Sequence, residues 1–175
     1  MPAPSPAALP EERPGLTPRA PARGFTDVFT RTLLRHPGPT TELLERRVRH
    51  RLRLRLLGQT LTGGTSGALR LVRRTELVAP DGTVVSRNLV LGRLPRDGEL
   101  VSALTSRSAP LGRSLAAYGV PQRRTPLSVG LAPWLGPGGG PSAVSRGYLL
   151  QLADEAPLYV RETFHPSVVP PERAP

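Results

Sequence analysis

The side chains of this sequence that could carry out chemistry are mainly arginine and glutamate. All 24 basic residues are arginine, and cysteine is absent, which excludes thiol catalysis and cysteine-based metal centres. The three histidines, His36, His50 and His165, lack the i, i+4 spacing that would place two of them on one helix face. There is no phosphate-binding loop and no Gly-x-Ser-x-Gly motif. We therefore predict no metal site.

Glu162 is the acidic residue whose position is most informative. It lies between Val160 and Phe164 in an alternating segment, so all three side chains share one face of the expected strand. If that face is the core, the carboxylate needs a partner such as an arginine. Arg146, near the start of the preceding expected strand, is a candidate second cation of a site. The alternative is an inward glutamate without a function.

The formal net charge of +11 raises nucleic acid, acidic membranes and small anions as partners. In residues 49–56 arginine alternates with His50 and leucine, so one face of a strand is basic. Such a row could neutralise phosphates or could be a solvated face. We favour the solvated face, because no aromatic residue lies among these arginines to stack on bases. A lack of lysine also indicates codon bias, which inflates the arginine count, so nucleic acid is not the expected partner.

The chain divides into a leader, one domain and a tail. Residues 1–23 contain seven prolines and few large apolar side chains, which predicts a disordered leader. Residues 24–168 form the expected domain, and residues 169–175 a flexible tail. No apolar run approaches the roughly 18 residues of a membrane span, and no signal-peptide pattern is present. The expected location is the cytoplasm, without membrane association.

The elements that must position these side chains are mostly hairpins. Residues 68–78 and 83–91 flank the turn Pro80-Asp81-Gly82, and residues 143–152 pair with 157–164. Further strands are expected at 49–56 and 122–131, with loops at 61–67 and 136–141 and helices beginning near Thr26, Thr40, residue 98 and residue 110. Strands in hairpins with helices grouped apart predict the α+β class. We expect a single antiparallel sheet of about six strands, with helices on one side and at the ends.

Three segments in order resemble the chorismate pyruvate-lyases, and most closely their actinobacterial chorismate lyase (4-hydroxybenzoate synthase) branch. The first runs from Arg74 through Gly82 to the strand Asn88-Leu89-Val90-Leu91. The second is Ser108-Ala109-Pro110-Leu111-Gly112-Arg113-Ser114-Leu115, and the third is Pro157-Leu158-Tyr159-Val160-Arg161-Glu162-Thr163-Phe164-His165-Pro166. The resemblance spans about residues 27–168 and implies the same fold.

The resemblance also implies an activity and a site. It implies a carbon–oxygen lyase of secondary metabolism that cleaves chorismate to 4-hydroxybenzoate and pyruvate without a cofactor. Arg74 would bind a carboxylate, and the turn of Leu111 and Gly112 would offer backbone N–H groups at a helix start. Glu162 would meet the hydroxyl end of the product. At the helix entry Pro39-Thr40-Thr41 the ubiquinone-pathway enzymes of the family carry a larger apolar residue near the product, which implies a wider or more polar pocket here, with Thr41 as a candidate substrate-binding residue.

Several alternatives remain open at this stage. Arg74 could be solvated, with Arg73 the inward residue of the strand. The same fold could catalyse another elimination or a cyclisation on a natural-product intermediate. It could also be a non-enzymatic small-ligand-binding domain, like those of GntR-type regulators, although no helix-turn-helix is evident. In each case the expected partner is a small anionic or aromatic molecule, and the sequence leaves monomer and homodimer open.

Overall fold

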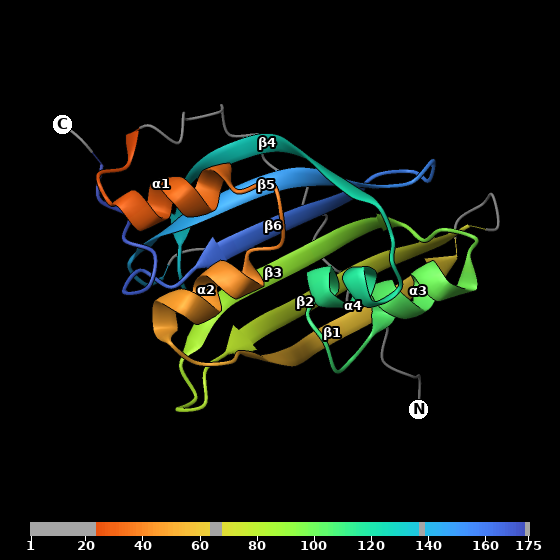
Figure 1. Ribbon diagram of the computed structural model, residues 1–175, viewed down its shortest axis with the longest axis horizontal. Helices are drawn as coiled ribbons and strands as arrows, with labels where there is room; N and C mark the ends of the chain where they lie inside the picture. The colour runs from red at the N-terminus through yellow and green to blue at the C-terminus, as the bar shows by residue number, and fades with distance from the viewer. Residues whose placement is uncertain (1–23, 64–67, 137–138, 174–175) are drawn as a thin grey trace, which may run out of the picture.

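The computed structural model describes residues 24–63, 68–136 and 139–173. Within them, six antiparallel strands form one sheet in the order β1-β2-β3-β6-β5-β4 (Figure 1). The strands are β1 (Arg53–Gly63), β2 (Leu69–Val78), β3 (Val84–Arg93), β4 (Gln122–Pro133), β5 (Ser142–Leu152) and β6 (Leu158–Phe164). This confirms the predicted α+β class and single antiparallel sheet.

The turn chemistry explains the β2–β3 hairpin. Gly82 has a φ of +89°, a conformation that glycine adopts without steric cost. The Asp81 carboxylate accepts a hydrogen bond from the Thr83 N–H at 2.9 Å, which closes the turn. One strand differs from its prediction: β1 starts at Arg53 and runs into the expected loop as far as Gly63. It starts late because Arg49 takes a left-handed φ of 60° where the preceding helix ends.

Four short helices lie on one face of the sheet: α1 (Val28–Arg35), α2 (Thr41–Val48), α3 (Gly98–Thr105) and α4 (Leu111–Ala117) (Figure 1). The Asp27 carboxylate caps α1 by accepting from the Thr30 N–H at 2.7 Å, and Asp97 caps α3 in the same way. Thr40 occupies the first cap position of α2, but its hydroxyl makes no capping bond.

Two hydrophobic clusters fill the space between the helices and the sheet. Around α1 and α2 lie buried residues that include Leu33, Leu44, Leu77 and Phe164. A second cluster around α3 and α4 includes Leu104, Leu115, Leu150 and Val160. The helix-covered face of the sheet therefore has a packed core at each end, and polar residues lie between the two.

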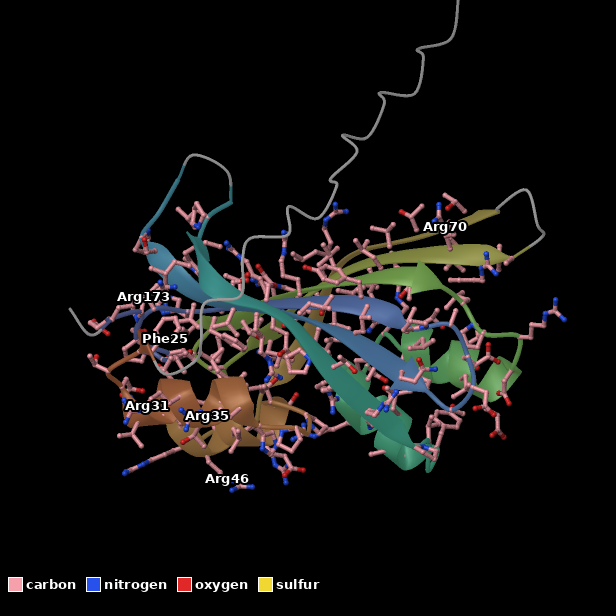
Figure 2. All side chains as sticks on the ribbon, turned by 90° about the horizontal axis from the view of Figure 1, so that it is seen from above. Phe25, Arg31, Arg35, Arg46, Arg70 and Arg173 are labelled. Carbon is pink, nitrogen blue, oxygen red and sulfur yellow. The ribbon has the colours of Figure 1, made fainter. Side chains whose placement is uncertain are left out.

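The opposite face of the sheet is not covered by any described helix (Figures 1 and 2). In Figure 2 the helices, with Arg31, Arg35 and Arg46, lie on one side, and Arg70 lies on the other. By strand alternation this open face carries many arginines. They are Arg53, Arg55, Arg70, Arg74, Arg87, Arg93, Arg123 and Arg161, whereas Glu76 is its one acidic residue among the described strands.

The segment after β6 corrects the predicted flexible tail. Val169 is fully buried, and Arg173 forms a β-bridge with Phe25. The Thr26 N–H donates to the Glu172 carbonyl at 3.0 Å, and the Thr30 hydroxyl donates to the Pro170 carbonyl at 3.0 Å. Residues 169–173 therefore belong to the domain. Figure 2 shows Phe25 and Arg173 at the same end of the molecule. The predicted leader, residues 1–23, lies outside the described residues.

Candidate functional site

A cavity of about 40 Å³ lies between the two hydrophobic clusters, on the helix-covered face of the sheet. Its floor consists of two rows of paired strand residues. Arg73, Val90, Val160 and Tyr148 form one row, and Thr75, Asn88 and Glu162 form the next. Arg146 continues the second row on β5, beyond the residues that line the cavity. Its rim includes Pro39, Thr40 and Thr41 before and in α2, Pro110, Leu111 and Gly112 at the start of α4, and Arg124 of β4.

Arg73 supplies a buried positive charge at one side of this cavity. It is only 2% exposed, and burial lowers the pKa of its guanidinium. Its Nη1 donates to the Gln59 Oε1 at 2.8 Å and to the Leu104 carbonyl at 3.0 Å, and its Nη2 donates to the Ser106 carbonyl. These acceptors are neutral, and Arg73 is in no ion pair among the described residues. A buried cation held this way favours an anionic ligand.

Arg74, predicted as the carboxylate-binding residue, does not lie in this cavity. Neighbouring strand residues point to opposite faces, so Arg74 is on the open face and lines a separate groove there. The inward orientation expected for Arg74 was therefore wrong by one residue of register. Arg73, the alternative left open by the sequence, is the inward arginine.

Glu162 lies in the second row and is held by two donors. The Arg146 Nε donates to its Oε2 at 2.7 Å, and the Thr40 hydroxyl donates to its Oε1 at 2.9 Å. Arg146 is 6% exposed and also donates to the Leu33 carbonyl at 3.0 Å. Arg146 thus meets the requirement of Glu162 for an arginine partner, whereas the sequence suggested Arg146 only as a second cation of the site. Arg146 supports Glu162 and is not among the residues that line the cavity.

Arg124 and Tyr148 complete the polar lining, and the sequence did not indicate either. The Arg124 Nη2 donates to the Gln122 Oε1 at 2.7 Å and Nη1 to the Pro37 carbonyl at 3.3 Å, whereas its buried Nε has no partner among the described residues. Its guanidinium is 5.7 Å from the centre of the Tyr148 ring. Burial raises the pKa of the Tyr148 phenol, which therefore stays neutral at pH 7.

The first turns of α2 and α4 meet at the rim. Thr41, Leu111 and Gly112, which the sequence analysis named as candidate substrate-binding residues, line the cavity. Gly112 is required by this approach, because a Cβ there would lie 2.6 Å from the Pro39 Cβ. The backbone N–H groups of a first helical turn have no partner within the helix, so they are available to an anion.

The cavity combines a strong charge bias with a small volume. Arg73 and Arg124 have no carboxylate partner among the described residues, while Glu162 is compensated by Arg146. The lining therefore carries two uncompensated cations. Small-molecule pockets usually exceed ~300 Å³. A ligand of that size requires the rim to move, and the rim includes Arg124, a partly exposed residue on the edge strand β4.

Glu45 connects the two helices that border the cavity. Its carboxylate accepts from the Leu52 N–H at 2.8 Å and from Arg113 of α4. Burial opposes ionisation of this group, but the Leu52 N–H and Arg113 outweigh it and lower the pKa of Glu45. A lowered folded-state pKa stabilises the protein above the unfolded value of 4.5 and loses that contribution as the pH falls further.

We expect Glu45→Gln to reduce the free energy of unfolding at pH 7 by about 1 kcal/mol, because charge-assisted hydrogen bonds are lost. The variant should also lose less stability than the wild type when the pH is lowered from 5 to 3. Urea unfolding at both pH values measures this. Glu42→Gln is the control, since among the described residues Glu42 forms an exposed ion pair with Arg46. An identical acid sensitivity in wild type and Glu45→Gln would contradict the expectation.

Comparison with known proteins adds no relative, since no family model and no curated protein matches the chain. No helix of the described residues is long and apolar enough to cross a membrane.

Proposed function

We propose that this protein is a chorismate lyase-like enzyme that cleaves chorismate to 4-hydroxybenzoate and pyruvate for a biosynthetic route. The observation that carries the proposal is the position of Arg73 and Glu162 in one cavity, beside Leu111 and Gly112. This set matches the family resemblance once Arg73 takes the place first given to Arg74. The cavity also fits the substrate in charge, because chorismate is a dianion and the lining has two uncompensated cations.

Each residue then has a defined role in the proposed reaction. Arg73 holds the ring carboxylate by charge-assisted hydrogen bonds, together with the backbone N–H groups of Leu111 and Gly112. Glu162, fixed by Arg146 and Thr40, accepts a hydrogen bond from the ring hydroxyl. Arg124 binds the second carboxylate, on the enolpyruvyl side chain. Contacts to both carboxylates and to the hydroxyl fix the orientation of the substrate ring, which lowers the entropic part of the activation barrier.

The reaction needs no external oxidant or reductant. The ring carbon that bears the hydroxyl loses its proton, and the neighbouring carbon releases the enolpyruvyl oxygen. The electron pair of the broken C–H bond completes the aromatic ring, and the released enolpyruvate takes up a proton to become pyruvate. The protein's contribution is to position the dianion and to stabilise charge on the departing oxygen, for which Arg124 is placed.

The direct test is incubation of the purified protein with chorismate, without added metal or nucleotide. Pyruvate, measured by a coupled lactate dehydrogenase assay, and 4-hydroxybenzoate, measured by chromatography, should appear in equal amounts. Protein-free chorismate corrects for spontaneous breakdown. Binding of 4-hydroxybenzoate without pyruvate release would favour a ligand-binding domain over an enzyme. Release of pyruvate with a different aromatic product would favour another elimination on the same fold.

A further inference from the structure

The phenol of Tyr148 is a polar group of the cavity that has no role in the proposed reaction. Tyr148 lies on β5, is 6% exposed and lines the cavity together with Glu162 and Arg124. Glu162 on β6 pairs with Arg146, which is two residues before Tyr148, so Tyr148 and Glu162 are diagonal neighbours on adjacent strands. Long side chains at diagonal positions are within reach of each other, so both can approach the same end of a ligand.

The hydroxyl of Tyr148 has a proton to donate into the cavity. The central carbons of the Arg124 and Arg146 guanidinium groups are 5.7 and 5.1 Å from the centre of its ring. A guanidinium group only donates hydrogen bonds, so neither arginine can accept this proton. The two oxygens of Glu162 accept from Arg146 and Thr40. No described residue accepts a hydrogen bond from the Tyr148 hydroxyl. Burial and the Glu162 charge raise the pKa of the phenol, so it remains a donor at neutral pH.

The strand order places this donor at one end of a bound ring. Arg73 on β2 and Glu162 on β6 are separated by β3, so their backbones are two strand spacings apart, roughly 10 Å. In the proposed function the ring carboxylate contacts Arg73 and the ring hydroxyl contacts Glu162. Tyr148 on β5 is beyond Glu162 as seen from Arg73, and therefore lies beside the hydroxyl end of the ring. The substituent next to that hydroxyl is the ether oxygen of the enolpyruvyl group.

We propose that the Tyr148 hydroxyl donates a hydrogen bond to this ether oxygen, so that the cavity selects cyclic carboxylates with an ether oxygen next to a ring hydroxyl. The inference rests on the proposed function, because it takes the orientation of the ring from Arg73 and Glu162. Negative charge gathers on the ether oxygen as its bond to the ring breaks, and a donor already in place stabilises that charge. Tyr148 keeps its own proton, so the balance of the reaction is unchanged.

Two aromatic ligands that cannot eliminate isolate this hydrogen bond. The ether ligand is 3-(carboxymethoxy)-4-hydroxybenzoate, and the methylene ligand is 3-(2-carboxyethyl)-4-hydroxybenzoate, in which a CH₂ group replaces the ether oxygen. In calorimetric titrations the wild type should bind the ether ligand about three- to tenfold more tightly, the range for a neutral hydrogen bond. Tyr148→Phe keeps the ring, which packs in the hydrophobic cluster around α3 and α4, and should remove this preference. It should also lower the turnover of chorismate about 10- to 100-fold.

Tyr159→Phe is the matched control, because it removes the same hydroxyl from β6 at a position that alternation puts on the open face of the sheet. This variant should retain both the preference for the ether ligand and the turnover. Circular dichroism verifies that the two variants are folded. Equal binding of the two ligands by the wild type would overturn the inference, and so would a preference that persists in Tyr148→Phe.

The two ligands also separate this inference from the proposed function. If the wild type prefers the ether ligand through Tyr148 but releases no pyruvate from chorismate, the lyase proposal fails and the recognition of the ether oxygen stands. If pyruvate is released and Tyr148→Phe changes neither turnover nor the preference, the lyase proposal stands and the role given to Tyr148 is wrong. Binding of neither ligand by the wild type would also overturn the inference.

Discussion

Replacing Arg73 by alanine should reduce the turnover of chorismate about 10- to 100-fold and weaken the binding of 4-hydroxybenzoate by a similar factor. The reason is the loss of a charge-assisted hydrogen bond in a dry site, which is worth about 1.5–3 kcal/mol. The substitution also leaves the Leu104 and Ser106 carbonyls without a donor, so stability should fall by about 1–3 kcal/mol. Initial pyruvate rates and calorimetric titration with 4-hydroxybenzoate measure the functional effects.

Arg74→Ala is the matched control for this experiment. It removes the same charge from the neighbouring position, which faces the groove on the other side of the sheet. Net electrostatic attraction of a dianion would be reduced equally by both variants, whereas a specific contact would be lost only in Arg73→Ala. If Arg74→Ala abolished activity and Arg73→Ala retained it, the register-based assignment of the site would be wrong.

Replacing Arg146 by methionine should lower the free energy of unfolding by about 3–5 kcal/mol. The variant leaves the Glu162 carboxylate buried without its cation, and an uncompensated buried charge costs far more than the intact pair contributes. Urea unfolding monitored by circular dichroism gives the value. Arg161→Ala, an exposed arginine on the same sheet, should change stability by less than about 0.5 kcal/mol.

The double variant Arg146→Met with Glu162→Leu separates this explanation from a loss of packing. Replacement of both members by apolar groups removes the unpaired charge, so most of the lost stability should return. The double variant should not turn over chorismate, because it lacks the Glu162 carboxylate that accepts a hydrogen bond from the ring hydroxyl. A double variant as unstable as Arg146→Met alone would instead show that packing of the arginine stem is the main contribution.

The fold was largely predictable because its local signals agree with one another. The Asp81-Gly82 turn and the alternating segments on both sides of it specify a hairpin independently of the rest of the chain. Alternation likewise placed Glu162 on the face of Val160 and Phe164, where a buried carboxylate needs a partner, whereas its expected role came from the family resemblance. Turn and alternation patterns of this kind depend only on residues that are close in sequence.

The choice between Arg73 and Arg74 was harder, because a shift of one residue exchanges the two faces of a strand. The alternation along the rest of this strand does indicate which of the two arginines points inward. Leu71 and Leu77 are in phase with Arg73, whereas Glu76 is in phase with Arg74, so the second set is the more polar one. Weighing the whole strand in this way would have favoured Arg73.

Other features depend on contacts that no local pattern contains. Arg124 enters the site because β4 pairs with β5, and Gln122 and Pro37 happen to supply acceptors at the edge. The buried Val169 lies in a proline-rich segment that reads as a tail. Its burial follows from the bridge between Phe25 and Arg173, which are at opposite ends of the described chain.

The strand order divides the sheet into two meanders, β1-β2-β3 and β4-β5-β6, that meet only where β3 pairs with β6. Arg73 belongs to the first meander and Glu162 to the second. Each meander pairs strands that are neighbours in sequence, but the β3–β6 seam joins residues as distant as Ser86 and Phe164 and costs the most chain entropy among the strand pairings of the sheet. The candidate site spans this seam, so a ligand that contacts both meanders should stabilise the folded sheet by mass action.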